Sequence, residues 1–154
     1  MGTMANDGSE QTVRSASEEV KATPDLELKL PARAENVAVV RHAFGGFAEA
    51  LSVDEQTLAD IKLAITEACT NVVIHAYDDD QDGSLEVDAS IDRRRLTVVI
   101  RDRGRGIVPR PDSPGLGLGL PLIATLAETL ELGRDHAEHT EVRMTFALDQ
   151  DEVG

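Results

Sequence analysis

Apolar residues recur at steps of three and four between Leu58 and Tyr77, which is the spacing of an amphipathic helix. Glu67, Asn71 and His75 follow one another at steps of four along the edge of this stripe. With a rise of about 1.5 Å per residue, Glu67 and Asn71 lie roughly 6 Å apart along the helix axis. The spacing therefore predicts a long helix that presents a carboxylate and an amide together, although a solvated polar edge has the same pattern. The stripe consists of Leu58, Ile61, Ile65, Ala68, Val72 and Ala76.

Two elements are predicted before this helix. Alternating leucines in residues 26–30 indicate a half-buried strand that ends at Pro31. Helical spacing predicts a helix over Ala34–Leu51, with a bend or close packing at Gly45-Gly46 because glycine weakens a helix. The segment Ser52–Glu55 has the pattern of a capping box, in which Ser52 caps the long helix.

Further elements are predicted after it. The acidic segment Asp78–Gly83 lacks the ligand pattern of a Ca²⁺ loop and is interpreted as a solvated turn. Residues 85–91 alternate as a strand, an exposed tip of three arginines follows, and residues 96–100 predict a more buried strand. Leu118–Leu132 has helical spacing, and Val142–Leu148 alternates as a closing strand.

This order of elements favours an α/β (α+β) two-layer sandwich, in which helices cover one face of a mixed, largely antiparallel sheet. At 154 residues, of which 41% are hydrophobic, the chain suits a single domain. The polar residues 1–24 are predicted to form a disordered tail, residues 25–149 the domain, and residues 150–154 a C-terminal tail.

Charge and cysteine content narrow the function classes. The net charge of −14, from 29 acids and 15 bases, repels phosphate backbones and argues against direct nucleic-acid binding. It suits a basic protein partner, or it serves solubility alone. The sequence shows neither an apolar signal-peptide core nor a membrane-spanning run. The single cysteine, Cys69, projects near the apolar stripe and is interpreted as a small buried residue, which fits a reducing, cytoplasmic setting.

Two further segments carry candidate chemistry. Asp102 stands directly after a predicted strand and before Gly104 and Gly106. A carboxylate there accepts a hydrogen bond from the exocyclic amine of adenine and repels a carbonyl, and glycines let a flat base approach the main chain. Gly115–Leu120 is glycine-rich and opens a predicted helix, whose free amides favour phosphates. Each segment alone also fits an ordinary turn or helix cap.

Together and in this order, the three segments resemble the motifs of the GHKL ATPase superfamily, whose nucleotide-binding domain is the Bergerat fold. The segments are E-A-x-x-N-x-x-x-H-A-Y, D-x-G-x-G-I and G-L-G-L-x-L-I. Within the superfamily, the short single domain and the His-Ala-Tyr run look like the anti-sigma factor serine/threonine kinases. The resemblance covers residues 26–148.

The resemblance implies a role for each matching position. Asn71 would ligate Mg²⁺ at the ATP phosphates, Glu67 would be the general base, and Asp102 would read the adenine amine. Three groups of residues would complete the nucleotide site: the base pocket, the phosphate amides, and the supporting His75 and Thr140. The base pocket would be shaped by Gly104, Gly106 and Ile107. The phosphates would be bound at the second glycine motif, which contains Gly115, Gly117, Leu118 and Gly119.

The implied function is an ATP- and Mg²⁺-dependent kinase that binds a sigma factor and phosphorylates a STAS-type anti-anti-sigma protein, as a homodimer that contacts neither nucleic acid nor membrane. The kinases often carry an arginine before the second glycine motif; here Arg103, Arg105 or Arg110 would have to replace it. Two alternatives therefore stay open, a non-catalytic nucleotide-binding module and a detached histidine-kinase ATPase domain. Against the latter, His42 lacks the neighbours of a phosphoacceptor histidine.

Overall fold

The computed structural model describes residues 23–78, 82–104, 114–134 and 139–148. The elements follow in the order β1 (Leu26–Pro31), α2 (Ala34–Ala50), α3 (Glu55–Asn71), η1 (Val72–Ala76), β2 (Ser84–Asp92), β3 (Arg95–Asp102), α4 (Pro114–Leu126), β4 (Thr129–Arg134) and β5 (Thr140–Ala147). Among the described residues, no helix is long and apolar enough to cross a membrane.

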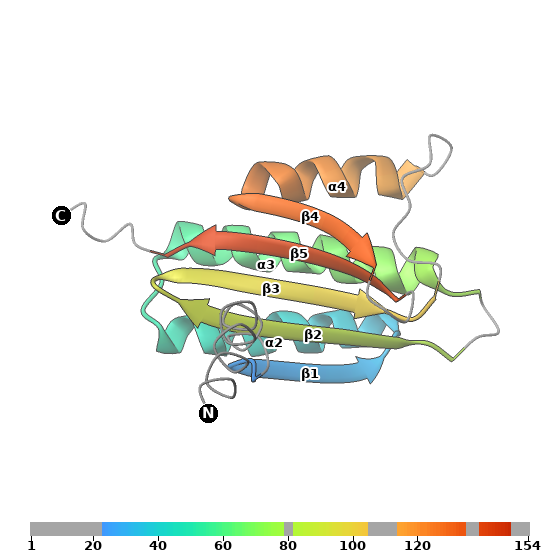
Figure 1. Cartoon of the computed structure of the whole chain (residues 1–154), viewed down its shortest axis with the longest axis horizontal. Helices are drawn as coiled ribbons and strands as arrows, with labels where there is room; N and C mark the ends of the chain where they lie inside the picture. Colours follow the sequence, from blue (N-terminus) through green and yellow to red (C-terminus); the bar gives the residue numbers. More distant parts are fainter. Residues whose placement is uncertain (1–22, 79–81, 105–113, 135–138, 149–154) are drawn as a thin grey trace, which may run out of the picture.

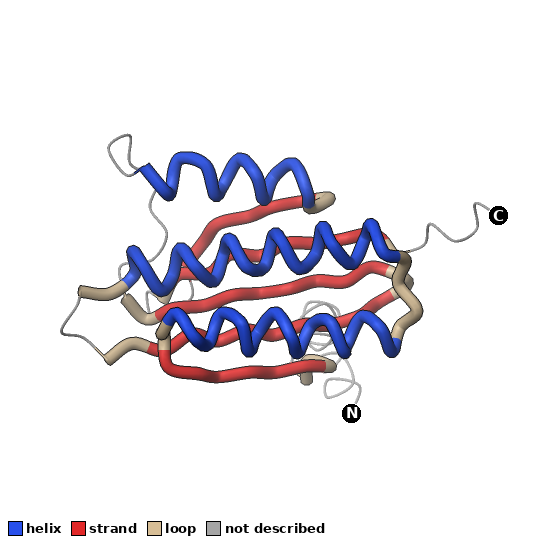
Figure 2. Tube along the Cα trace, turned by 180° about the vertical axis from the view of Figure 1, so that it is seen from behind, coloured by secondary structure: helices blue, strands red, loops and turns tan. Residues whose placement is uncertain are grey.

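The strands form one five-stranded sheet in the order β1-β2-β3-β5-β4. Figure 1 shows this sheet in front of the helices, and Figure 2 shows the three helices side by side across its other face. The predicted two-layer sandwich is thus confirmed. Each pairing between described strands is antiparallel, so the mixed component expected from the sequence is not found there.

The core lies between the helices and the inner face of the sheet. From α3 it receives the predicted apolar stripe, in which Ile61, Ile65 and Ala68 are fully buried. Alternate residues of β2 and β5 face the helices, as their period-two burial shows. Cys69 is buried as predicted, and burial raises the pKa of its thiol to about 12, so it remains protonated.

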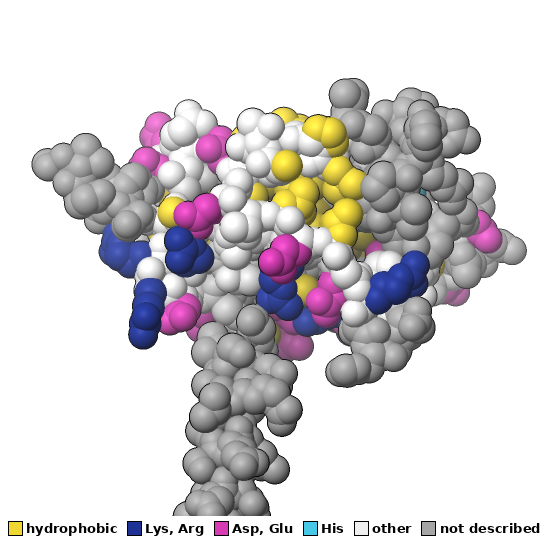
Figure 3. Space-filling model, turned by 45° about the horizontal axis from the view of Figure 1, so that its top comes forward, with side chains coloured by type: hydrophobic (Ala, Val, Ile, Leu, Met, Phe, Trp, Pro, Cys, Tyr) yellow, Lys and Arg dark blue, Asp and Glu magenta, His cyan; other side chains and the backbone are white. Residues whose placement is uncertain are grey.

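The predicted helix over Leu118–Leu132 is wrong at both ends. The observed α4 begins at Pro114 and ends at Leu126, and Thr129–Arg134 forms the edge strand β4. In β4, Leu130 lies opposite Met144 of β5 and Leu132 opposite Val142. Pairing with β5 gives these residues the backbone hydrogen bonds of a strand. Apolar side chains gather at the surface near the α4–β4 edge (Figure 3). Leu132 of β4 is 46% exposed.

The capping box at Ser52 is also wrong. The N-cap of α3 is Asp54, whose carboxylate accepts a hydrogen bond from the Thr57 amide at 2.8 Å. Ser52 has a φ of 59°, so its backbone adopts the left-handed conformation in the turn between α2 and α3. In α2, Gly45-Gly46 neither interrupts the helix nor is required by packing, because a Cβ at Gly46 would meet nothing within 4 Å.

The arginine tip between β2 and β3 is confirmed. Arg93 and Arg94 have φ values of 55° and 61°, which is the conformation of a tight two-residue hairpin turn with the twist that antiparallel strands require. Asp92 pairs directly with Arg95 across this turn.

Candidate active site

The first site segment is the C-terminal turn of α3. Asn71 is its last residue and only 3% exposed, and Glu67 lies half-buried one turn earlier. A Cβ added at Gly119 would lie 2.7 Å from Asn71 Nδ2 and 3.4 Å from Glu67 Oε1. The backbone of α4 therefore packs directly on both side chains, and a side chain at position 119 would have to displace the end of Asn71. The structure brings together three residues that the sequence predicted for one site.

Asn71 carries an unsatisfied polar group. Its Nδ2 is buried and makes no hydrogen bond with any described residue. Leaving such a group unpaired costs about 1–3 kcal/mol, so its burial calls for a reason. Because an amide's oxygen and nitrogen exchange places by rotation, the position can also present an acceptor oxygen. An amide oxygen is a ligand that Mg²⁺ accepts beside waters and substrate phosphates, so this residue fits the predicted metal role.

The helix changes character after Asn71. Val72–Ala76 forms η1, a π-helical turn, which is a rare feature often found at functional sites. His75 is half-buried on this turn, and Ile74 is 60% exposed.

The second segment is the end of β3. Asp102 is 2% exposed, and both of its carboxylate oxygens are held. Its Oδ2 accepts a hydrogen bond from Thr140 Oγ1 at 2.5 Å, and its Oδ1 accepts one from the Gly104 amide at 2.9 Å. Thr140 lies directly opposite Asp102 in the β3–β5 pairing. Each oxygen keeps a free lone pair, so the carboxylate can accept further hydrogen bonds from a ligand.

Burial raises the pKa of Asp102 above its ordinary value. The hydrogen bonds from Thr140 and Gly104 oppose this rise, as do the charges of Arg134 and His139. Sequence reasoning missed Arg134 as a neighbour because it assigned no strand there. The alternation of Leu130, Leu132 and Arg134 was the signal available.

Gly104 joins the two segments. A Cβ at this position would lie 2.0 Å from the Ala76 carbonyl oxygen and 2.9 Å from the Tyr77 ring. The turn after Asp102 therefore passes over the end of η1 with no space for a side chain. This contact fixes the Asp102 carboxylate relative to the helix that carries Asn71.

The third segment is the start of α4. In a helix that begins at Pro114, the amides of Gly115 and Leu116 lack partners inside the helix, as the first amides of any helix do. Pro121 within α4 has no amide hydrogen to donate to the Gly117 carbonyl. Of Gly115, Gly117 and Leu118 only the helical backbone is described, and Gly106 and Ile107 lie outside the described residues.

The arginines proposed to replace the missing cation are only partly described. Arg103 donates from Nε to Glu86 Oε2 at 3.1 Å, on β2, and its side chain is 51% exposed. Its charge is thus engaged with a strand residue. Arg105 and Arg110 lie outside the described residues.

Known proteins resemble this chain in sequence and in fold. The family model of the histidine kinase-like ATPase domain matches residues 30–146. The serine-protein kinase RsbW of Halalkalibacterium halodurans is 34% identical over 143 residues, covering 83% of this chain and 86% of that protein. RsbW of Bacillus thuringiensis is also 34% identical, covering 83% and 88%.

Solved structures agree with the sequence relatives. The RsbU and RsbW domains of Rv1364c from Mycobacterium tuberculosis match with a TM-score of 0.65 and 25% identity, over 82% of this chain. This chain spans 33% of that one. The histidine kinase domain of the Erythrobacter litoralis EL346 blue-light activated histidine kinase matches with a TM-score of 0.51 and 29% identity, over 63% of this chain and 47% of that one.

The fold and the site segments together define an ATPase domain of the GHKL superfamily. Within that superfamily, the chain belongs to the family of RsbW-like anti-sigma serine/threonine kinases. It is accordingly a nucleotide-using protein serine/threonine kinase.

Proposed function

We propose that this kinase binds a sigma factor and transfers the γ-phosphoryl group of ATP to a serine or threonine of a STAS-type anti-anti-sigma protein. The observation that carries the proposal is the meeting of Glu67, Asn71 and Gly119 from two helices, where the buried side-chain amide of Asn71 has no hydrogen-bond partner among the described residues. The two protein partners would compete for the kinase, and phosphorylation would remove one of them. The reaction would take place in the cytoplasm, with the kinase as a homodimer.

Each site residue has a defined task in this mechanism. The Asp102 carboxylate accepts a hydrogen bond from the adenine amine, and Thr140 and Gly104 orient this carboxylate by their own hydrogen bonds to it. Asn71 would hold Mg²⁺, and the metal would supply positive charge beside the phosphate oxygens. Glu67 accepts the proton of the substrate hydroxyl as its oxygen bonds to phosphorus, and ADP leaves. The free amides at the start of α4 orient phosphate oxygens.

A phosphotransfer assay tests this function. The kinase is incubated with labelled ATP and the STAS protein encoded by a neighbouring gene. We expect label on a serine or threonine of that protein, and ADP release that depends on it. No transfer to any cognate STAS protein would favour the non-catalytic module, and label on a histidine would favour the histidine-kinase alternative. His42, the test position for that alternative, is exposed on α2, with Nδ1 at 2.8 Å from the Ala38 carbonyl.

The metal role has its own test. In Asn71→Ala, we expect most of the Mg²⁺-dependent part of ATP affinity to be lost, because the metal loses its protein ligand. Binding without metal should stay nearly intact. Calorimetry with and without Mg²⁺ measures both, and equal losses in the two titrations would show that Asn71 acts on the nucleotide or the fold instead.

A further inference from the structure

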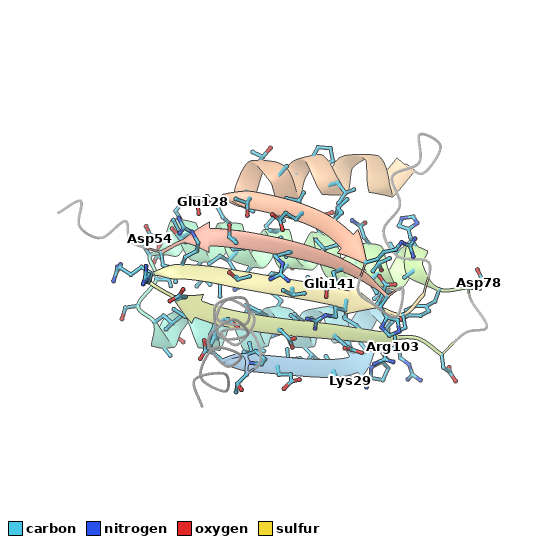
Figure 4. All side chains as sticks on the ribbon, viewed as in Figure 1. Lys29, Asp54, Asp78, Arg103, Glu128 and Glu141 are labelled. Atoms are coloured by element: carbon cyan, nitrogen blue, oxygen red, sulfur yellow. The ribbon has the colours of Figure 1, made fainter. Side chains whose placement is uncertain are left out.

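Tyr77 forms a hydrogen-bonded junction next to the adenine side of the site. Its hydroxyl donates to the Ser84 carbonyl at 2.7 Å and accepts from the Ser84 amide at 3.1 Å and the Arg103 amide at 2.8 Å. A phenolic hydroxyl has one hydrogen and two acceptor lone pairs, so these three bonds use its full capacity. Figure 4 labels Arg103, whose amide takes part in this junction, and Asp78, which follows Tyr77 in the chain.

The junction lies where the β2–β3 pairing stops. The last described pair at this end is Glu86 with Arg101, and the same register continued by two residues would place Ser84 opposite Arg103. The main-chain groups of Ser84 and Arg103 instead both bond to the Tyr77 hydroxyl. The hydroxyl thus ends the ladder and lets the chain leave the sheet directly after Asp102.

Two glycines hold the ring of Tyr77 in this position. A Cβ at Gly83 would lie 2.2 Å from Cε2 of the ring, and a Cβ at Gly104 would lie 2.9 Å from its Cδ1. Neither position can carry a side chain while the ring stays in place. Gly104 is also the residue whose amide donates to Asp102 Oδ1.

We propose that Tyr77 is a positioning residue for adenine recognition: its hydroxyl holds the Arg103 backbone so that the Asp102 carboxylate points at the base. The effect passes from the Tyr77 hydroxyl through the Arg103 amide to the two neighbouring residues, Asp102 and Gly104. The inference rests on the proposed ATP site and adds a residue to it that touches no reacting atom.

Tyr77→Phe tests the proposal because it keeps the ring and removes only the hydroxyl. We expect ATP to bind about tenfold more weakly, equivalent to about 1.4 kcal/mol, with the preference for ATP over GTP reduced. The phosphotransfer rate at saturating ATP should stay within about twofold, because the phosphate side is unchanged. The matched control is Thr129→Val, which removes a hydroxyl bonded to Thr145 at the other end of β5 and should leave both affinities unchanged.

A double-mutant cycle separates positioning from general stability. If Tyr77 acts through Asp102, the loss of ATP affinity in the double variant Tyr77→Phe/Asp102→Asn will be smaller than the sum of the losses in the two single variants. Gly83→Ala keeps the hydroxyl but displaces the ring, so it should reproduce the loss of selectivity if Tyr77→Phe does not fold. Unchanged selectivity in these variants, or full additivity, overturns the inference alone. Wild-type protein that binds no ATP overturns the proposed function and this inference together.

Discussion

The two sides of the proposed nucleotide site, one for adenine and one for the phosphates, are built differently. On the adenine side, Asp102, Thr140 and Ala76 are at most 9% exposed, and the carboxylate is tied by two hydrogen bonds. On the phosphate side, α4 begins with three glycines and contains Pro121. Glycine lowers helix stability by about 1 kcal/mol and proline by about 3 kcal/mol relative to alanine.

The difference shows where each side gets its stability. The adenine side is part of the antiparallel sheet and the end of α3, so it is formed by the core itself. The first turns of α4 have weak helical propensity and depend on contacts such as that of Gly119 with Asn71. Substitutions on the adenine side should therefore affect folding or base recognition, and those on the phosphate side should affect catalysis.

The largest effect is expected for Glu67→Gln, on the phosphate side. The change keeps the side-chain shape and removes the base, so turnover should fall at least about a hundredfold, within the 10²–10⁴-fold range of general-base catalysis. This corresponds to about 3–5 kcal/mol of barrier. Binding of ATP and the sigma factor should match the wild type, as calorimetry would show. A fully active variant would remove Glu67 from the mechanism.

The next largest effect is expected for Asp102→Asn, on the adenine side. An amide cannot offer acceptors on both atoms, so the charge-assisted hydrogen bond to the adenine amine is lost or reversed. ATP binding should weaken by about 1.5–3 kcal/mol. Calorimetry with ATP measures this change, and an unaltered affinity would refute the assignment of Asp102 to the base.

A pair of glycine substitutions compares the two sides directly. In Gly104→Ala, the methyl meets the Ala76 carbonyl at 2.0 Å, and overpacking of this kind costs about 1–3 kcal/mol of unfolding free energy. In Gly119→Ala, the methyl meets the end of the Asn71 side chain at 2.7 Å, while the helix gains up to about 1 kcal/mol in propensity. Urea unfolding should therefore show a loss only for Gly104→Ala.

The phosphotransfer rate should reveal the effect of Gly119→Ala that the unfolding experiment does not show. Gly119→Ala places a methyl between α4 and the two side chains proposed to hold metal and proton, so its phosphotransfer rate should fall even though the fold is stable. A Gly119→Ala variant with both normal stability and normal turnover would mean that α4 does not need to approach Asn71. Gly46→Ala, on the open surface of α2, is the control for glycine removal alone.

The smallest effect is expected from pH. Burial raises the Asp102 pKa above the ordinary value of about 3.9. The folded protein therefore holds this proton more tightly than the unfolded chain, and the Asp102 contribution to stability falls as pH rises through that window. ATP needs the charged form, so its affinity should fall as the solution is acidified through the raised pKa. Titrations at several pH values should show this dependence in the wild type and not in Asp102→Asn.

Much of the fold was predictable from local patterns. The period of the apolar stripe in α3 and the alternation in β1, β2 and β5 report which face each element buries, and burial of that face is what stabilises the element. The sequence order of the carboxylate, amide and glycine motifs also predicted which segments would build the site, and the structure brings Glu67, Asn71 and Gly119 of these motifs together. These predictions rest on neighbours within a few residues of each other.

What the tertiary structure decided depends on contacts between distant segments. Strand β4 forms because it pairs with β5, and this pairing outweighs the helical spacing of Leu122, Leu126 and Leu130. The contact of Gly104 with Ala76 and the three bonds of the Tyr77 hydroxyl arise only when β3 ends beside η1. A local pattern states which side of an element is apolar, but the partner it meets there is set by how the whole sheet and its helices pack.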